Sequence, residues 1–427
     1  MDCSSKLIIN GGNPLFGRVK LSGSKNGALP IIAAALLMGN GVTTLENVPD
    51  ISDIHTMAKM IERLGAKVNF DVTMRTMIID ASVIAKDEPP CELANAMRAS
   101  FYVAGPLLAR LGSARLPQPG GCSIGSRPVS YIVEAFKGLG VTSIDDENLV
   151  TLKSSGLVGA EIVLDPKYCS PGATFNVVMA ATLAKGKTVL KNASVDPEVK
   201  SFCEFLVKSG AKINGIGTKI LEIEGVSELN GVKHEIISDR IEGGTYLIAG
   251  LATKGDVEVY PLNPQDIGSL LDILTEMGAK ISYTENGVRA EWVKGLTSSS
   301  AHTTPFPGFP TDLQPPLVVL MAMAKGVSTL NEEIYDGRLN YTNELCVMGA
   351  SVDVSGGNSN VLIMGVEELV GREVCGTDMR AGAALVIAAL SAKGASEVTG
   401  MDYIVRGYED IAGKMRAVGA DIKLVKE

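Results

Sequence analysis

Two glycine-rich stretches place side chains that can do chemistry in segments we expect to be loops. Residues 22–30 read SGSKNGALP and put Lys25 just before an apolar run. The free N–H groups of a helix start would help a lysine there to bind phosphate; a solvated lysine beside a helix cap is the alternative. Residues 119–128 read PGGCSIGSRP and carry Cys122 and Arg127. Nearby cations lower the pKa of such a thiol and make it reactive, although a lone cysteine is more often buried and inert.

One carboxylate and four arginines stand at junctions between expected elements. Asp312 lies among prolines in residues 306–315, FPGFPTDLQP, where it would either act in acid–base chemistry or cap a helix. An arginine at a helix start opposes the helix dipole and is costly unless an anion binds there. A surface ion pair is the alternative for each arginine taken singly. The arginines concerned are Arg98, Arg338, Arg380 and Arg406.

Composition and charge exclude several classes of protein. Of the 427 residues, 46% are hydrophobic and 20% charged, which is typical of folded proteins rather than disordered ones. The longest apolar run, residues 31–38, is far shorter than the ~20 residues that span a membrane. The net charge of −9 disfavours nucleic acid as a partner.

The cysteines and histidines also limit what the protein does. The seven cysteines form no C-x-x-C pair, and the three histidines lie far apart in the sequence. No residue spacing typical of a zinc site is present, so no metal is expected. We expect reduced thiols in the cytoplasm, because the first residues also lack the pattern of a secretion signal.

A repeat of about 70 residues organises the whole chain. An element of the form Leu-Gly-Ala-Lys-Val recurs six times, with glycines at positions 65, 140, 210, 278, 349 and 419. A second set of glycines precedes the first by 23 to 28 residues, at positions 41, 112, 186, 255, 326 and 394. Two interleaved sets with such consistent offsets indicate six related structural units.

The residues around these glycines predict the elements of one unit. Residues 174–185 and 380–393 are apolar on nearly all sides, which indicates buried helices. A glycine just beyond such a helix fits a left-handed helix end. Residues 188–190 and 257–260 are typical of strands. Six units of two helices and several strands favour two domains of three, with a ligand site in the cleft between them.

At these residues the chain resembles the enolpyruvyl transferases over essentially its full length. The run Lys25-Asn26-Gly27-Ala28 is similar to the branch of the family that uses a UDP-sugar. The shikimate branch carries a serine-asparagine-arginine run after its lysine instead. The matching stretches are residues 22–30, 97–100, 119–128, 239–242, 309–314, 377–381 and 406–409.

The resemblance implies both a fold and an activity. The fold would be an inside-out α/β barrel (α/β, α+β) of two domains, each with three βαβαββ repeats. The first domain would span residues 25–236, and the second residues 1–24 plus 237–427. The activity would be transfer of the enolpyruvyl group from phosphoenolpyruvate to the 3′-hydroxyl of UDP-N-acetylglucosamine with release of phosphate, the first committed step of peptidoglycan synthesis. No metal or organic cofactor would be needed.

The resemblance also implies roles for the residues of the phosphoenolpyruvate side. Cys122 would be the general acid of its loop, and the epoxide antibiotic fosfomycin would alkylate it. Asp312 would take the proton of the acceptor hydroxyl or stabilise the cationic transition state, and Lys25 would share in catalysis. The groups expected to hold phosphoenolpyruvate are Lys25, Arg127 and Arg406 for its phosphate and Arg338 and Arg380 for its carboxylate.

The acceptor side departs from the family pattern. Ser130 and Tyr131 stand where aspartate and leucine are usual, residues 167–171 form a longer stretch, and Phe306 replaces a common histidine. A different nucleotide or sugar acceptor therefore stays open, as does a binding or regulatory module without activity. The residues expected to contact the UDP-sugar are Asn26, Arg98, Pro128, Val129, Ser130, Tyr131, Ser170, Pro171, Gly172, Asp312 and Ile334.

Overall fold

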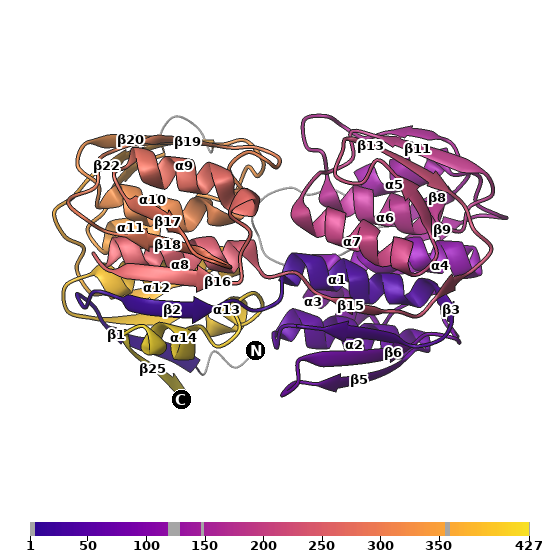
Figure 1. Cartoon of the computed structure of the whole chain (residues 1–427), viewed down its shortest axis with the longest axis horizontal. Coiled ribbons are helices and arrows are strands. Elements are labelled where there is room, and N and C mark those ends of the chain that lie inside the picture. The colour runs from indigo at the N-terminus through magenta and orange to yellow at the C-terminus, as the bar shows by residue number, and fades with distance from the viewer. Residues whose placement is uncertain (1–4, 118–128, 147–148, 355–358, 427) are drawn as a thin grey trace. The chain divides into compact units, whose positions relative to one another are not determined.

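The computed structural model describes residues 5–117, 129–146, 149–354 and 359–426 (Figure 1). Their contacts divide the chain into two compact units. Unit 1 holds the described residues of 5–22 and 238–426, and unit 2 those of 23–117 and 129–237. The chain therefore leaves unit 1 after its first two strands and returns to it near residue 238.

Unit 1 contains three four-stranded sheets among its described residues. In each sheet one neighbouring pair is parallel and the other pairs are antiparallel. The strand orders are β19 (Ser300–Thr303), β20 (Val327–Glu332), β22 (Asn360–Met364), β21 (Ser351–Asp353); β17 (Lys280–Tyr283), β18 (Val288–Glu291), β16 (Asp256–Tyr260), β2 (Phe16–Lys20); and β23 (Glu373–Cys375), β24 (Ala395–Thr399), β1 (Ser5–Asn10), β25 (Asp421–Lys426).

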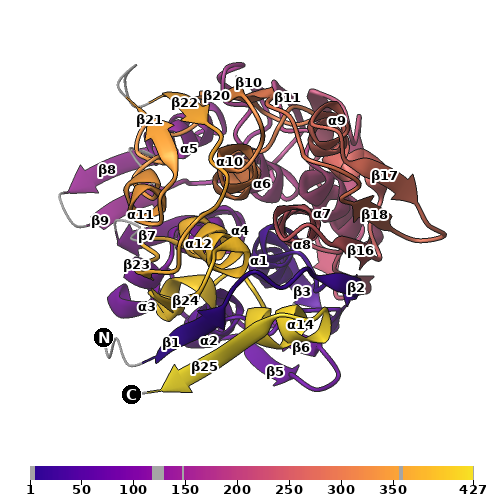
Figure 2. The same ribbon diagram turned by 90° about the vertical axis from the view of Figure 1, so that its left-hand side faces the viewer.

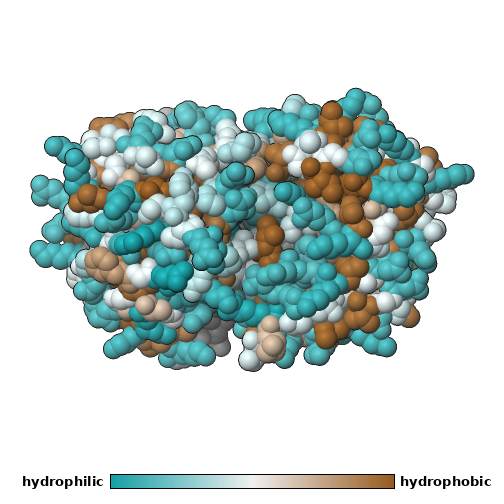
Figure 3. Space-filling model, viewed as in Figure 1, coloured by the Kyte–Doolittle hydropathy of each residue, from teal (hydrophilic) through white to brown (hydrophobic). Residues whose placement is uncertain are grey.

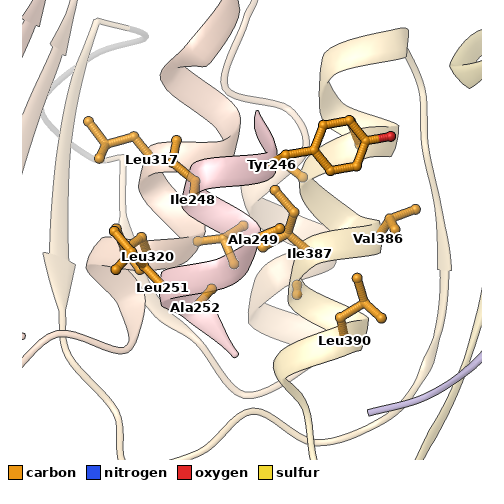
Figure 4. Close-up of a cluster of buried hydrophobic side chains, with 14 of the residues drawn as sticks. Tyr246, Ile248, Ala249, Leu251, Ala252, Leu317, Leu320, Val386, Ile387 and Leu390 are labelled. Atoms are coloured by element: carbon orange, nitrogen blue, oxygen red, sulfur yellow. The ribbon is translucent and has the colours of Figure 1, made fainter. Parts of the chain in front are cut away.

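Three buried helices form the centre of unit 1, α8 (Arg240–Ala252), α10 (Gln314–Ala322) and α12 (Met379–Ser391). Each is apolar on nearly all sides, so each is stable only where neighbours cover every face. Figure 2 shows the sheets arranged around these helices, and Figure 4 shows apolar side chains of α8 packed against those of the other two. The remaining helices of unit 1 are η3 (Pro264–Ile267), α9 (Gly268–Glu276), η4 (Thr311–Leu313), α11 (Thr342–Val347), α13 (Met401–Ile404) and α14 (Ile411–Ala417).

Unit 2 repeats the same plan with a second hydrophobic core. Its strand orders are β15 (Lys233–Glu235), β4 (Thr43–Glu46), β6 (Thr76–Asp80), β5 (Lys67–Asp71); β10 (Glu161–Val163), β11 (Lys187–Lys191), β13 (Ile220–Glu224), β12 (Lys212–Asn214); β7 (Ser113–Pro117), β9 (Leu149–Lys153), β8 (Thr142–Asp146); and β14 (Leu229–Asn230), β3 (Met38–Asn40). Its helices are α1 (Lys25–Ala34), η1 (Ala35–Leu37), α2 (Ser52–Leu64), α3 (Cys91–Ala96), η2 (Arg98–Val103), α4 (Ala104–Leu111), α5 (Ser130–Gly138), α6 (Pro171–Ala181) and α7 (Pro197–Lys208).

The expected βαβαββ repeat is confirmed in these elements. One complete copy runs β19, α10, β20, α11, β21 and β22 in chain order. A second copy runs β10, α6, β11, α7, β12 and β13. In two other sheets a distant segment supplies the first strand: β2 pairs in parallel with β16, and β15 pairs in parallel with β4. The predicted mixed α/β fold, with helices inside and sheets outside, is therefore correct.

The six glycines of the Leu-Gly-Ala element mark the ends of helices, as predicted. All have a φ between 84° and 124°, in the region that favours glycine. The prediction is wrong for much of the second set: Gly112 caps α4, but Gly41 follows β3, and Gly186 and Gly326 lie several residues beyond α6 and α10. Gly255 alone in that set has no positive φ, because Lys254 takes the left-handed conformation with a φ of 60°. Gly255 is needed for close approach instead, since a Cβ there would lie 2.0 Å from the Leu15 carbonyl oxygen.

The surface and the helix lengths give two further facts. Hydrophilic residues predominate on the face shown in Figure 3, and hydrophobic residues lie there in separate groups. In the described part of the chain, no helix combines the length and the apolar character that crossing a bilayer requires.

His234 is a buried titratable residue of unit 2, far from the expected site residues in the sequence. It lies in β15 with its Nε2 3.1 Å from Ser201 Oγ, and its ring meets that of Phe205 edge to face. Burial, with a smaller contribution from the charge of Lys208, lowers the pKa of His234 to about 4. The unfolded chain binds a proton there at about pH 6.5, so acid favours unfolding.

Replacing His234 with Gln, whose amide nitrogen stands near the position of Nε2, should reduce the acid sensitivity of the fold. The stabilisation from neutral His234 is present above the unfolded-state pKa and is lost as the pH falls toward 4. Between pH 7 and pH 4 the wild-type free energy of unfolding should therefore fall by about 3 kcal/mol more than that of the variant. Urea denaturation at both pH values measures this, and equal losses would contradict the lowered pKa.

Candidate active site

A carboxylate held between two buried arginines forms the most strongly charged cluster of unit 1. Asp312 lies in η4, just ahead of α10. Arg338 Nη2 donates to Asp312 Oδ1 at 2.7 Å, and Arg380 Nη2 donates to Asp312 Oδ2 at 3.1 Å. The two arginine side chains are 3% and 2% exposed, whereas that of Asp312 is 24% exposed. The carboxylate is thus the part of this cluster that solvent reaches.

The members of the cluster come from two repeats of unit 1. Arg380 is the second residue of α12, and Asp378 caps that helix by accepting from the N–H groups of Arg380 and Ala381. Arg338 lies in the loop between β20 and α11, in the same repeat as Asp312. Pairing Asp312 with both arginines therefore joins this repeat to the one that contains α12.

The expectation that all four arginines oppose a helix dipole is wrong for most of them. Arg380 alone among the four lies in the first turn of an α-helix. Arg338 lies in a loop, Arg406 falls between α13 and α14, and Arg98 begins the short 3₁₀ helix η2. Their placement reflects loop geometry at the repeat junctions, where a helix dipole has little influence.

The two arginines keep Asp312 ionised. Burial alone would raise the pKa of Asp312, but the charges of Arg380 and Arg338 and their hydrogen bonds outweigh that effect and hold the pKa well below its usual range. In turn, the Asp312 charge raises the pKa of both arginines despite their burial. Asp312 is therefore a carboxylate at neutral pH and cannot act as a proton donor in this state.

The arginines offer more donors than Asp312 accepts. Arg380 Nε, Arg380 Nη1 and Arg338 Nε are buried and have no hydrogen-bond acceptor among the described residues. Asp312 accepts from one nitrogen of each arginine, while the charges of Asp378 and Glu332 act on Arg338, and that of Asp239 on Arg380, without a hydrogen bond to these three N–H groups. Buried N–H groups without acceptors are costly, and guanidinium groups bind carboxylates through two parallel hydrogen bonds. The cluster is suited to a second carboxylate.

Two tyrosine rings lie beside this cluster, each close in the sequence to an expected residue of unit 1. Tyr408 is buried, and its ring centroid is 5.3 Å from the guanidinium carbon of Arg380. Arg406 is half-buried, two residues earlier in the same segment. Ile334 is also half-buried, and its neighbour Tyr335 has its ring centroid 5.5 Å from the guanidinium carbon of Arg338.

Lys25 is the centre of a second charged site, in unit 2. It is the first residue of α1, which Ser24 caps by accepting from the N–H of Gly27 at 3.2 Å. Lys25 Nζ lies 2.7 Å from Asp53 Oδ2, and both side chains are less than 10% exposed at 8% and 6%. The alternative of a solvated lysine is therefore wrong. Asn26, the next residue, is exposed.

Six of the expected acceptor residues lie at the starts of α5 and α6 of unit 2, namely Val129, Ser130, Tyr131, Ser170, Pro171 and Gly172. Ser170 caps α6 by accepting from Ala173 N at 3.3 Å. The rings of Tyr131 and Tyr168 lie 5.8 Å apart, and Lys167 Nζ is 5.1 Å from the Tyr168 ring centroid. The others are distributed as follows: Val129 is buried, Ser130 and Pro171 are exposed, and Arg98 and Gly172 are half-buried.

Three expected residues lie outside the described part of the chain, namely Cys122, Arg127 and Pro128. Conversely, three site neighbours were not predicted from the sequence, Asp53, Asp378 and Tyr408. An aspartate just before an apolar helix is a recognisable cap signal, so the capping role of Asp378 could have been predicted from the sequence. Asp53 and Tyr408 gave no such signal, because their partners are distant in the sequence. Within the described ranges, no group of three or more His, Cys, Asp or Glu side chains is placed to hold a metal ion.

Comparisons with known proteins identify the family of this chain. A family model described as EPSP synthase (3-phosphoshikimate 1-carboxyvinyltransferase) matches residues 9–415. A protein of Halothermothrix orenii named UDP-N-acetylglucosamine 1-carboxyvinyltransferase is 43% identical over 99% of this chain and 100% of its own length. A Staphylococcus aureus protein named UDP-N-acetylglucosamine 1-carboxyvinyltransferase 1 is 40% identical, over 99% and 100%.

Solved structures show the same fold. The enolpyruvyl transferase NikO from Streptomyces tendae matches with a TM-score of 0.89 at 25% identity, over 99% of both chains. An EPSP synthase from Acinetobacter baumannii matches in fold with a TM-score of 0.73 at 16% identity, over 99% of this chain and 100% of its own. The chain belongs to the EPSP synthase family of enolpyruvyl transferases.

Replacing Asp312 with Asn would leave two buried cations without their shared anion. We expect the free energy of unfolding at pH 7 to fall by about 3 kcal/mol, as when a buried ion pair loses one partner. Because the folded-state pKa is lowered, the stabilisation is complete above the unfolded-state pKa of about 4 and is lost as the pH falls through the folded-state value.

The free energy of unfolding of the wild type exceeds that of this variant, and the excess should therefore be about 1 kcal/mol smaller at pH 3 than at pH 7. Urea denaturation at both pH values, with sucrose in all samples to keep them folded, measures it. Replacing the exposed Asp402 with Asn is the matched control and should cost less than about 0.5 kcal/mol. A difference that does not change with pH would contradict the ion-pair assignment.

Proposed function

We propose that this protein transfers the enolpyruvyl group of phosphoenolpyruvate to the 3′-hydroxyl of UDP-N-acetylglucosamine and releases phosphate, the first committed step of peptidoglycan synthesis. The relatives that carry this name match over the whole chain. The observation that carries the proposal is the buried pair Arg338 and Arg380, whose free N–H groups lack an acceptor beside a carboxylate that can serve as a base.

The anionic groups of phosphoenolpyruvate divide between two kinds of site. Its carboxylate is planar and matches the forked N–H groups of Arg338 and Arg380. Its phosphate is assigned to Lys25, Arg127 and Arg406. Lys25 is suited to this role because its ammonium group belongs to the first residue of α1, where the helix dipole favours an anion.

Asp312 changes its strength as a base when phosphoenolpyruvate binds. In the free protein both arginines stabilise its charged form, so its pKa is too low for it to accept a proton readily. A substrate carboxylate on the same arginines compensates part of their charge and adds a negative charge nearby. Both effects raise the pKa of Asp312 and bring it closer to the range in which a general base works well.

The proposed reaction removes a proton from the acceptor hydroxyl and adds a proton to the methylene carbon of phosphoenolpyruvate. Asp312 takes the proton of the 3′-hydroxyl as its oxygen bonds to the central carbon of the enolpyruvyl group. The methylene carbon takes up a proton, for which Cys122 is the proposed donor, and returns one when the carbon–oxygen bond to phosphate breaks. Cys122 lies outside the described residues, so its role, including alkylation by fosfomycin, stays a prediction from the family pattern.

A different nucleotide or sugar acceptor is the second candidate function. The observation that favours it is the aromatic pair Tyr131 and Tyr168, with Lys167 near the latter ring. This pair is built from the segments where the sequence departs from the family pattern. Tyr131 is 46% exposed, and its ring offers a stacking surface to a nucleobase. An acceptor screen separates the two candidates.

The cysteines support the proposed cytoplasmic location. Five cysteines are described, and all are free thiols: Cys91, Cys169, Cys203, Cys346 and Cys375. Unpaired cysteines are typical of proteins in a reducing compartment.

The direct test is phosphate release from purified protein supplied with phosphoenolpyruvate and UDP-N-acetylglucosamine. Release should require both substrates. Replacing Arg380 with Lys keeps the charge but removes the forked donors, so the KM for phosphoenolpyruvate should rise about tenfold or more while that for the sugar nucleotide changes little.

The matched control is Arg416→Lys, at an arginine of α14 whose Nη1 donates to the Ile422 carbonyl. It should leave both KM values near those of the wild type. Absence of turnover with the sugar nucleotide, but turnover with another acceptor, would favour the second candidate. Absence of turnover with every acceptor would overturn the proposed function.

A further inference from the structure

Glu332 is a buried carboxylate that the proposed reaction does not yet use. It is the last residue of β20 and is 1% exposed. Its Oε1 accepts from Thr303 Oγ1 at 2.8 Å, from Ile334 N at 2.9 Å and from Tyr335 N at 3.1 Å. Its Oε2 accepts from Thr311 Oγ1 at 2.8 Å.

These contacts suit a group that only accepts. An ionised carboxylate accepts from all four donors, whereas an amide or a protonated acid would instead donate to the Thr311 hydroxyl and reverse that hydrogen bond. The strands hold the carboxylate in place, because Thr303 and Glu332 are register partners at the ends of the parallel strands β19 and β20. Glu332 therefore fixes the positions of the donors around it.

One of those donors determines how Arg338 is held. Arg338 Nη1 donates to Thr311 Oγ1 at 3.0 Å. A hydroxyl has a single hydrogen, and that of Thr311 is directed to Glu332, so its lone pairs face Arg338. The result is a directed chain from Arg338 through Thr311 to Glu332. Thr311 is also the residue before Asp312, so the same contact fixes the start of η4.

A second neighbour of Arg338 is also held by Glu332. The Tyr335 ring lies near the guanidinium group of Arg338, and the N–H of Tyr335 is bound to Glu332 Oε1. Thr311 and Tyr335, which both contact Arg338 in the described structure, thus depend on one carboxylate. Asp312 contacts Arg338 directly.

We propose that Glu332 is a positioning residue for phosphoenolpyruvate binding. Acting through Thr311 and Tyr335, it holds the Arg338 guanidinium so that two of its nitrogens are occupied and Nε stays free for the substrate carboxylate. Glu332 makes no contact with substrate in this role. The inference rests on the proposed function, since it assigns Arg338 to that carboxylate.

The test compares Glu332→Gln and Thr311→Val with Thr311→Ser in steady-state kinetics. The Gln side chain keeps the shape but turns one acceptor into a donor, and Val removes the hydroxyl while keeping the volume. Both should raise the KM for phosphoenolpyruvate about tenfold and change the KM for the sugar nucleotide by less than about threefold. Thr311→Ser retains the hydroxyl and should restore the wild-type value within about threefold.

The double variant Glu332→Gln/Thr311→Val should be no worse than the more impaired single variant, because both changes break one chain of contacts. The matched control is Glu344→Gln, at a half-buried carboxylate of α11 that accepts from Cys375 N. It removes a charge from the same unit and should leave both KM values unchanged.

The outcomes separate the inference from the proposed function. A wild type that turns over, with Thr311→Ser as impaired as Thr311→Val, would overturn the positioning role. Equal rises in both KM values for Glu332→Gln would do the same, because they would reflect a general structural effect. A wild type that turns over no acceptor would instead overturn the proposed function, and this inference with it.

Discussion

Two guanidinium groups buried beside a single carboxylate are the constraint on which this account depends. Burying a charge is costly unless a partner of opposite sign compensates it. Asp312 accepts from one nitrogen of each arginine, and three buried N–H groups have no acceptor in the described structure. The cluster is stable enough to form and still offers donors to one more anion. These unused donors are what suits it to bind a substrate carboxylate.

The fold accommodates this charged cluster because apolar residues and charged residues occupy different parts of each repeat. The buried helices α8, α10 and α12 supply almost continuous apolar surface. Charged residues stand at the ends of elements: Asp312 before α10, Arg380 in the first turn of α12 and Arg338 after β20. Two repeats of one plan thus bring three charged residues to one place within unit 1. These residues are far apart in the sequence, but the packing of the repeats brings their side chains together.

Much of the fold was predictable from the sequence, since periodic glycines and apolar runs report on local structure. The helices around 174–185 and 380–393 and the strands at 188–190 and 257–260 follow from such patterns. Partnerships across the chain were not predictable. Lys25 shows no sign in the sequence of its pairing with Asp53, and Glu332 gives none of its link to Thr311. The roles of Arg338 and Arg380 came only from the family pattern, and the donors that they leave free required the coordinates.

The most direct test of the central claim is the titration of the Asp312 carboxyl by carbon-13 NMR, with Asp312→Asn to identify its resonance. The account predicts that Asp312 stays ionised down to the lowest pH at which the free protein is folded. It also predicts that phosphoenolpyruvate raises the pKa of Asp312, because the ligand carboxylate shares the arginines. An ordinary pKa near about 4 in the free protein, unchanged by phosphoenolpyruvate, would contradict the account.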